Sequence, residues 1–242
     1  MPAGPNPKAM DRKGTLGLIP AKGGSTRLAR KNLRVLGGKS LLAWAVDAAR
    51  ASGVLDRLIV SSEDEGVLEE ARRCGAETPF VRPAELARDP FGVVDVALHA
   101  LEQCEAAGLR YRTLVILLPT CPFRTVADVT AGFRLFQEAE AKFLMSVSEY
   151  PHTPFAAMRL DPEGTLQPFF PEYIGKQSQE LPQAYRCNGA LHVLDVAAFQ
   201  ASRSYYSTPL IGYPMPRSRS VDIDTEEDLA EAEWRLAQGR HG

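Results

Sequence analysis

The 242-residue sequence lacks three features that would place it in a specialised class of protein. It has only four cysteines, which show neither the CxxC spacing of a zinc site nor the density of a disulfide framework. Its formal net charge is −2, so it has no broad basic surface to hold nucleic acid. It has no run of about 20 apolar residues, the length that spans a membrane. We therefore expect a protein of the reducing cytoplasm with a small-molecule partner.

The first 13 residues also lack an apolar stretch, and they are rich in proline, glycine and charge. We expect a mobile tail there, neither a signal peptide nor an anchor. The remainder, 14–242, is expected to form one globular domain with room for a small insertion, because the whole chain is 45% hydrophobic and 24% charged.

Strand and helix patterns alternate along the chain, which predicts an α/β fold with a doubly wound, mostly parallel sheet. Continuous apolar runs between turn residues indicate strands, and apolar residues at helical spacing indicate helices. Ser40 is placed to cap the first helix. The predicted strands cover 15–20, 57–61, 78–81, 114–118, 143–147, 190–194 and 210–213. The predicted helices cover 41–49, 64–74, 94–107, 127–140 and 226–238.

The alternation stops between residues 150 and 185, where six of the 18 prolines fall. An irregular stretch of this length inside a compact domain is usually a functional lid or an interface. We expect an inserted arm here.

A loop with glycines and cations follows the first predicted strand. It contains Gly23, Gly24 and Ser25, together with four cations: Lys22, Arg27, Arg30 and Lys31. Glycines let backbone N–H groups approach phosphate oxygens, and the cations neutralise their charge. The glycine spacing of this loop does not match GxGxxG. The later segment Gly38-Lys39-Ser40 is not a P-loop, because the glycine that begins the P-loop motif is missing. The position favours a nucleoside triphosphate site; a solvated basic turn is the alternative.

Aspartates occupy alternate positions, 222 and 224, of the segment 221–225. In an extended chain Asp222 and Asp224 share one face, while Val221 and Ile223 point to the core. Two carboxylates suit Mg²⁺, which takes its other ligands from substrate phosphates and water. The alternative is that Asp224 only serves the N-terminus of the last helix, since Thr225 and Asp228 form a capping pair.

Two other segments are candidates for ligand contact. Arg186 precedes a predicted strand, and a guanidinium can hold a carboxylate through two hydrogen bonds. Residues 118–124 end a central strand with two prolines and offer a rigid edge for a flat base. Cys121 lies in this segment without a neighbouring histidine, so a packed thiol is favoured over a nucleophile. His99 and His192 are interpreted as structural.

Five motifs, spread over residues 16–236, resemble the N-acylneuraminate cytidylyltransferase family and its legionaminic and pseudaminic acid relatives. They are IPAKGGSTRLARKN at 19–32, RPAELARD at 82–89, LLPTCPFRT at 117–125, QELPQAYRCNGALHV at 179–193 and RSVDIDTEEDL at 219–229. The resemblance implies a Rossmann-like nucleotidyltransferase fold. It also implies transfer of CMP from CTP to a nine-carbon acidic sugar, with Mg²⁺ as cofactor and a homodimer formed through the 150–185 arm.

The family's site residues carry over to matching positions of this chain. The resemblance implies catalytic roles for Lys31, Asp222 and Asp224, with the two aspartates as Mg²⁺ ligands. It implies sugar contacts for Arg186 and Asn188. Nucleotide contacts are implied for Lys22, Gly24, Ser25, Arg27, Asn32, Arg82, Pro119 and Thr120.

Some positions depart from the family pattern. Lys22 and Thr26 stand where the family has arginine and lysine, Leu118 stands in place of a glutamine beside the sugar, and Ser178 in place of an arm arginine. Arg27 is placed to compensate in the first loop. The sugar therefore stays open between sialic, legionaminic and pseudaminic types. The sequence is also compatible with a cytidylyltransferase for an eight-carbon keto-deoxy acid, with a uridylyl or guanylyl transferase, and with a non-catalytic nucleotide-binding protein.

Overall fold

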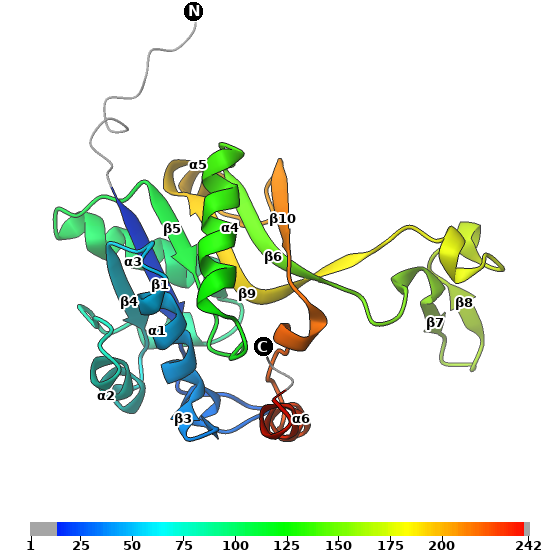
Figure 1. Cartoon of the computed structure of the whole chain (residues 1–242), viewed down its shortest axis with the longest axis horizontal. Helices are drawn as coiled ribbons and strands as arrows, with labels where there is room; N and C mark the ends of the chain where they lie inside the picture. The colour runs from blue at the N-terminus through cyan, green and yellow to red at the C-terminus, as the bar shows by residue number, and fades with distance from the viewer. Residues whose placement is uncertain (1–13, 240–242) are drawn as a thin grey trace, which may run out of the picture.

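The computed structural model describes residues 14–239, so the tail predicted at 1–13 lies outside the described residues. Its centre is a six-stranded sheet in the order β10-β6-β9-β5-β1-β4 (Figure 1). The strands are β1 (Thr15–Pro20), β4 (Arg57–Ser61), β5 (Thr113–Ile116), β6 (Phe143–Glu149), β9 (Tyr185–Asp195) and β10 (Leu210–Pro214). Of these six strands, β9 runs antiparallel to its neighbours, β5 and β6, and the other pairs are parallel. The predicted α/β fold with a mostly parallel sheet is confirmed.

Helices cover both faces of this sheet, and the bounds of all except α5 follow the predicted ones closely. One face carries α1 (Leu41–Ala51), α2 (Glu65–Arg73) and α4 (Val126–Glu138), and the other carries α3 (Val93–Ala106) and α5 (Val196–Ser202). The last helix, α6 (Glu226–Ala237), packs on the loops at the edge of the body. Among residues 14–239, no helix is both long and apolar enough to cross a membrane.

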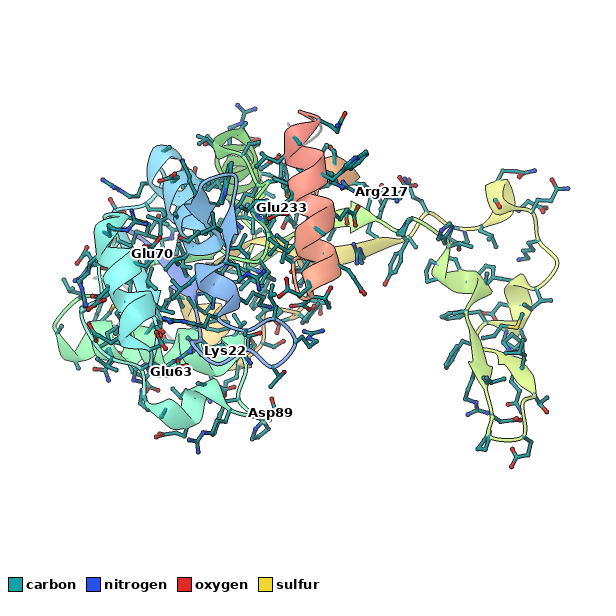
Figure 2. All side chains as sticks on the ribbon, turned by 90° about the horizontal axis from the view of Figure 1, so that it is seen from below. Lys22, Glu63, Glu70, Asp89, Arg217 and Glu233 are labelled. Atoms are coloured by element: carbon teal, nitrogen blue, oxygen red, sulfur yellow. The ribbon has the colours of Figure 1, made fainter. Side chains whose placement is uncertain are left out.

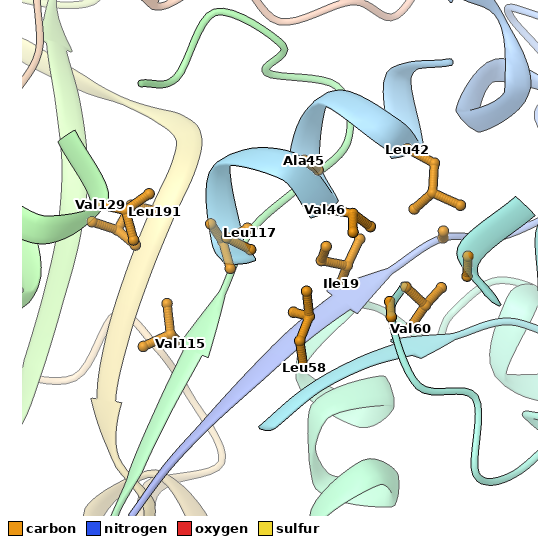
Figure 3. Close-up of a cluster of buried hydrophobic side chains, with 14 of the residues drawn as sticks. Ile19, Leu42, Ala45, Val46, Leu58, Val60, Val115, Leu117, Val129 and Leu191 are labelled. Carbon is orange, nitrogen blue, oxygen red and sulfur yellow. The ribbon is translucent and has the colours of Figure 1, made fainter. Parts of the chain in front are cut away.

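The two apolar layers are set by the alternation of side chains along each strand. In β1, Leu16 and Leu18 are fully buried against α3, while Ile19 is buried on the opposite face against α1. Figure 3 shows Ile19 and Val60 beneath α1. Each fully buried aliphatic side chain stabilises the fold by about 1.5–3 kcal/mol.

Side-chain caps fix where the helices begin, and so fix the loops that precede them. Ser40 Oγ accepts a hydrogen bond from the N–H of Ala43 at 3.0 Å, as predicted. Asp64 caps α2 through the N–H of Val67 at 3.0 Å. Thr125 forms a capping box with Asp128 at the start of α4.

Some elements differ from the sequence prediction. The strand predicted at 78–81 is wrong: the structure has only an isolated bridge between Ile59 and Glu77, and Pro79 has no N–H to continue the pairing. β9 begins at Tyr185 instead of residue 190, because its polar first residues conceal a strand that extends beyond the core. The short helix α5 and the strand pair β2 (Val35–Leu36) and β3 (Lys39–Ser40) were not predicted.

The 150–185 segment projects from the body as an arm (Figure 1). The N–H of Tyr150 donates to the carbonyl of Ala184 at 3.1 Å, which closes the arm at its neck. The arm contains the hairpin of β7 (Met158–Leu160) and β8 (Leu166–Pro168). Its other regular pieces are the 3-10 turns η4 (Pro154–Ala156), η5 (Pro171–Tyr173) and η6 (Ser178–Glu180).

Candidate active site

The loop that follows β1 is held in place by hydrogen bonds at both of its ends. The N–H of Gly23 donates to Glu63 Oε1 at 2.8 Å, and Asn32 Nδ2 donates to the carbonyl of Lys22 at 2.7 Å. A Cβ atom on residue 23 would lie 2.4 Å from the Cβ of Asp64, so only glycine fits there. Asn32 belongs to the 3-10 turn η2 (Lys31–Leu33), which ends the loop. The loop therefore has a defined shape despite its polar sequence.

A cavity of about 210 Å³, here called the inner cavity, opens beside this loop. It brings together the residues predicted to contact the nucleotide from three separate motifs: Lys22, Lys31, Asn32, Arg82, Pro119 and Thr120. Its other walls are largely apolar and come from the segment before α3 and from α3 itself: Leu86, Ala87, Phe91, Val93 and Val96. Sequence reasoning missed these apolar residues. Gly24 and Ser25 do not belong to its described lining and lie nearer the loop's tip.

Arg82 is the buried cation of the inner cavity, with only 3% of its surface exposed. It pairs with Glu63, the same carboxylate that holds the loop at Gly23. Burial by itself would raise the pKa of Glu63. The hydrogen bonds from Arg82 and from backbone N–H groups outweigh burial and hold that pKa below its usual range. Glu63 thus joins the loop to the inner cavity (Figure 2).

Glu63 was also missed from the sequence. The signal that could have found it is its position just past the carboxyl end of β4, where open α/β sheets gather their ligand-binding residues.

Asp222 and Asp224 line one cavity, as the alternation predicts, whereas Val221, also predicted to point to the core, is only partly buried and lines that cavity too. Ile223 is fully buried beneath them, in a cluster with Leu28 and Phe123. Asp224 contacts two cations of the first loop: its Oδ1 lies 2.5 Å from Lys31 Nζ, and its Oδ2 lies 2.6 Å from Arg27 Nη2. The fold thus brings together an acid pair and a cationic loop that are 193 residues apart.

The alternative role for Asp224, as a helix cap, does not match the hydrogen bonds. Thr225 Oγ1 accepts from the N–H of Asp228, and Asp228 Oδ2 accepts from the backbone N–H groups of Asp224 and Thr225. The cap of α6 is therefore Thr225 with Asp228. The carboxylate of Asp224 stays directed to the loop cations.

Asp222 has a perturbed acidity. Desolvation by the surrounding protein raises its pKa above the usual range even though the residue keeps an exposed surface, the hydrogen bond from Thr120 opposes that rise, and the neighbouring charge of Asp224 adds to it. Lys31 and Arg186 favour the ionised form of Asp222. Two close carboxylates of this kind attract a cation. Within 14–239 there is no cluster of three or more His, Cys, Asp or Glu arranged as metal ligands, so a cation here would need further ligands from substrate and water.

A second cavity, of about 760 Å³ and here called the outer cavity, contains the acid pair and Arg186. Its lining comes mainly from the start of the arm, from residues 217–225 and from α6, and it includes Ser148, Ser218, Ser220 and Trp234. Lys31 and Thr120 line the inner cavity and contact Asp224 and Asp222 of the outer one. The two cavities are therefore neighbours across the acid pair.

Asn188, predicted to contact the sugar, is not among the residues that line the outer cavity. It is buried, with 3% exposed. Its Oδ1 accepts from Ser146 Oγ at 2.5 Å and from the N–H of Ala190 at 3.1 Å, and its Nδ2 donates to Ser220 Oγ at 2.9 Å. A side chain with these partners supports the wall of the cavity from within.

The thiol and imidazole groups near the site have structural environments. Cys121 is fully buried, burial raises its pKa to about 12, and its Sγ donates to the carbonyl of Asn188 at 2.9 Å. A thiol with that pKa is not a nucleophile at neutral pH. Burial also lowers the pKa of His192 to about 4, so its ring is neutral.

Comparison with known proteins agrees with this geometry. Residues 16–106 match the family model described as cytidylyltransferase. The chain is 30% identical over 218 residues to a pseudaminic acid cytidylyltransferase of Campylobacter jejuni, and the match covers 88% of this chain and 91% of that protein. It is 29% identical to a CMP-N,N'-diacetyllegionaminic acid synthase of Legionella pneumophila, over 89% of this chain and 93% of that one.

Solved structures resemble the fold. The structure titled CMP:2-keto-3-deoxy-manno-octonic acid synthetase complexed with CTP has a TM-score of 0.70 at 15% identity and covers 94% of this chain and 100% of its own. A 4-diphosphocytidyl-2C-methyl-D-erythritol synthase from Anaerococcus prevotii has a TM-score of 0.62 at 10% identity, over 93% and 99% of the two chains. At these identities the likeness speaks for the fold alone. The relatives of 29–30% identity go further, and the chain belongs to the cytidylyltransferase family that includes the pseudaminic acid, legionaminic acid and N-acylneuraminate enzymes.

Proposed function

We propose that this protein is a nucleotidyltransferase that transfers CMP from CTP to the anomeric hydroxyl of a nonulosonic acid and releases pyrophosphate. The observation that carries the proposal is the contact of Asp224 with Lys31 and Arg27, at the boundary between the two cavities. Metal-binding acid and phosphate-binding cations must stand this close to act on one phosphorus atom. The activities named for the relatives agree with it.

The inner cavity suits the cytidine half of CTP. Phe91 and Val96 offer an apolar wall to a flat base, and Pro119 and Thr120 form a rigid edge beside it. Arg82 lines this cavity and is held in place there by its ion pair with Glu63. The phosphates would then extend along the first loop, where Lys22, Gly24, Ser25, Arg27 and Lys31 offer N–H groups and positive charge.

The outer cavity suits the acidic sugar. Its volume of about 760 Å³ is within the range that small-molecule sites use, and Arg186 provides a guanidinium for the sugar carboxylate. Asn188 acts indirectly in this proposal, by supporting the Ser220 turn beneath the cavity.

Family members of this class use a divalent cation, and the acid pair fits one. Asp222 and Asp224 would hold it, with substrate oxygens and water as its remaining ligands, which is the arrangement that Mg²⁺ prefers. When bound, such a cation neutralises charge on the phosphate oxygens. Lys31 and Arg27 now neutralise Asp224, so they are already in place to meet phosphate oxygens instead.

The bond changes are those of an in-line displacement. The sugar's anomeric hydroxyl oxygen forms a bond to the α-phosphorus of CTP and releases its proton to water, the bond from that phosphorus to the bridging oxygen breaks, and pyrophosphate leaves with the bonding electrons. The protein's contribution is to hold the two reactants in line across the cavity boundary. Lys31 and Arg27 stabilise the charge on the leaving pyrophosphate.

The 150–185 arm supports a homodimer in the proposal. Its hairpin and turns carry apolar side chains that are about half or more exposed: Met158 (47%), Leu160 (65%), Leu166 (59%), Phe169 (60%) and Ile174 (51%). Apolar groups gathered on a projecting segment mark an association surface. We expect twice the chain mass in sedimentation equilibrium, and a monomer for the double variant Leu160→Glu, Phe169→Asp. A monomeric wild-type protein would contradict the dimer.

Pyrophosphate release tests the function. The protein is mixed with CTP, Mg²⁺ and one acid at a time: pseudaminic, N,N'-diacetyllegionaminic and N-acetylneuraminic acid, and the eight-carbon 3-deoxy-manno-octulosonate. We expect release with at least one nine-carbon acid, with CTP preferred over UTP, GTP and ATP, and none above background for Asp224→Asn. If no acid gives release with the wild-type protein, the proposed function is wrong and a non-catalytic nucleotide-binding role is favoured.

A further inference from the structure

Arg217 is a cation of the outer cavity to which neither the motifs nor the comparisons give a role. It begins the 3-10 turn η7 (Arg217–Arg219), between β10 and the acid pair. Its side chain is exposed and lies between α6 and the base of the arm (Figure 2). It therefore faces the same cavity as Arg186, which comes from a different element, β9.

Two arginines of the outer cavity form no ion pair, although the charge of Arg186 does act on Asp222. Four arginines line it. Arg27 pairs with Asp224, and Arg235 pairs with Glu231 at 2.6 Å. Among the described residues, Arg186 and Arg217 have no carboxylate within ion-pair distance. The cavity thus holds two guanidinium groups that an anionic ligand can satisfy.

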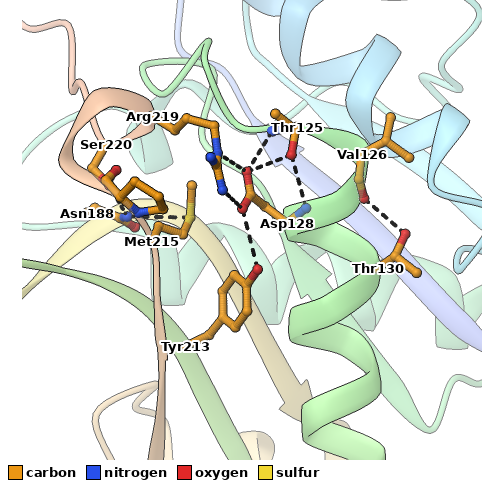
Figure 4. Close-up of polar contacts among 10 residues, drawn as sticks. Thr125, Val126, Asp128, Thr130, Asn188, Tyr213, Met215, Arg219 and Ser220 are labelled. Atoms are coloured by element: carbon orange, nitrogen blue, oxygen red, sulfur yellow. Dashed lines mark hydrogen bonds and ion pairs between the residues drawn. The ribbon is translucent and has the colours of Figure 1, made fainter. Parts of the chain in front are cut away.

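The turn that carries Arg217 is anchored from below (Figure 4). Arg219 forms two hydrogen bonds with Asp128, Nε to Oδ2 at 2.9 Å and Nη2 to Oδ1 at 2.8 Å, and Asp128 is 1% exposed. Ser220 Oγ donates to the carbonyl of Pro216 at 2.9 Å and accepts from Asn188 Nδ2. The backbone on both sides of Arg217 is therefore fixed, while its own side chain is left to the solvent and the cavity.

A fixed backbone under an unpaired arginine is what a preorganised anion contact requires. Ordering a loop on binding costs affinity, and that cost is avoided when protein contacts have already ordered it. A surface arginine with a purely solubilising role has no need of a buried ion pair and an asparagine beneath its turn. Asp128, which also caps α4 with Thr125, is buried, and its ion pair with the partly exposed Arg219 holds this turn against α4.

We infer that Arg217 is a second sugar-binding residue, which shares the carboxylate of the acidic sugar with Arg186. The inference rests on the proposed function. Arg186 approaches the carboxylate from β9 and Arg217 from the η7 turn, so the acid is held between them with its anomeric hydroxyl toward Asp222 and Asp224. Arg217 contributes to recognition of the acid and takes no part in the bond changes.

Steady-state kinetics on Arg217→Gln tests this assignment. The acid used is the one of the four that gives the fastest pyrophosphate release. Its methyl ester, which lacks the negative charge, tests whether Arg217 contacts the carboxylate. We expect the KM for the acid to rise about 10- to 100-fold, the range for a lost charge-assisted hydrogen bond. The KM for CTP, and the KM for the ester, are expected to change less than about threefold. The KM of Arg217→Lys for the acid is expected to lie between those of wild type and Arg217→Gln, because lysine keeps the charge but lacks the planar guanidinium.

Arg235→Gln is the matched control, because this arginine lines the same cavity while Glu231 already neutralises it. It is expected to leave the KM for the acid within about twofold of wild type. If Arg217→Gln behaves like Arg235→Gln, or raises the KM for acid and ester equally, the role of Arg217 is refuted while the proposed function stands. If the wild-type protein turns over no acid, the proposed function fails and the role of Arg217 fails with it.

Discussion

The inner and outer cavities lie at the same edge of one sheet, yet their charged side chains are neutralised in different ways. In the inner cavity the buried cation Arg82 is paired with Glu63, and the amide of Asn32 is bonded to the loop. In the outer cavity Arg186 and Arg217 form no ion pair among the described residues, although the charge of Arg186 acts on Asp222, and the carboxylates of Asp222 and Asp224 interact with each other. The inner cavity is complete for a largely uncharged, flat group. The outer cavity reaches charge balance only with an anion and a cation bound.

This difference indicates how one fold serves several sugars. In the proposed function the nucleotide, which the family members share, binds a fixed cavity with satisfied contacts. The sugar, which varies, binds a few exposed side chains on supported turns, which can change without disturbing the core. Four substitutions can break or sharpen this comparison.

The largest expected effect is on the acid pair. Asp224→Ala removes one of the two proposed cation ligands and leaves Lys31 and Arg27 without their ion-pair partner. We expect kcat to fall about 10³-fold or more, since charge stabilisation in the transition state is lost. Glu231→Gln is the control, because it removes a carboxylate of the same cavity away from the loop. Pyrophosphate release measures both, and equal activities would show that the carboxylate of Asp224 has no special role.

The support of the outer cavity comes next. Asp128→Asn breaks a nearly buried ion pair, and we expect the free energy of unfolding at pH 7 to fall by about 4 kcal/mol. Burial would raise the pKa of Asp128, but the hydrogen bonds from Arg219 and Thr125 keep it below the usual range. A lowered folded-state pKa stabilises the protein above the unfolded value of about 3.9, and this stabilisation is lost as pH falls further.

Urea denaturation of wild type and Asp128→Asn as a function of pH tests the direction of this pH dependence. The difference between the two proteins is expected to be constant between about pH 5 and 7 and to shrink below about pH 4. A difference that grows as the pH falls would contradict the ion pair as its source.

Breaking the ion pair of Glu63 with Arg82, which joins the loop to the inner cavity, should lower the free energy of unfolding somewhat less. Glu63→Gln leaves Arg82 without its partner, and we expect a loss of about 3 kcal/mol in the free energy of unfolding. We also expect a KM for CTP about tenfold higher, with the KM for the sugar unchanged, because the change lies on the nucleotide side. Glu65→Gln, an exposed carboxylate two residues on, is the control. Sugar KM values that rise together with that of CTP would show that the two cavities are not separate in function.

The sequence predicted much of this arrangement where a local rule decides it. Apolar runs located β1 and β4 to the residue, and the alternation of 221–225 predicted which side Ile223 would bury. The resemblance gave catalytic roles to Lys31 and Asp224 without placing them together, and the structure supplies their contact.

The sequence could not predict which polar residues support others. Asn188 lies in a motif that suggests a ligand contact, yet the fold places Ser146, Ala190 and Ser220 around its amide. Glu63 carries no motif of its own and gains its role only when Arg82 and Gly23 come together. The 78–81 strand failed for a different reason: Pro79 has no N–H to continue the pairing beyond the isolated bridge at Glu77.

The smallest effect concerns Asn188. Asn188→Ala removes the hydrogen bonds that Ser146 and Ser220 make with the Asn188 amide, and we expect the free energy of unfolding to fall by about 2 kcal/mol. Ser220→Ala removes one of the same hydrogen bonds from the other side. If Asn188 acts through the turn, both variants raise the KM for the sugar by similar factors; a direct sugar contact would make Asn188→Ala far worse than Ser220→Ala.

The central claim is that nucleotide and cation meet between the inner cavity and the acid pair. A crystal structure with CTP and Mn²⁺, read by the anomalous signal of the metal, tests it most directly. We expect the metal peak at the carboxylates of Asp222 and Asp224, the base in the inner cavity beside Arg82, and the phosphates against Lys31. A metal bound elsewhere, or a base lying in the outer cavity, would contradict the claim.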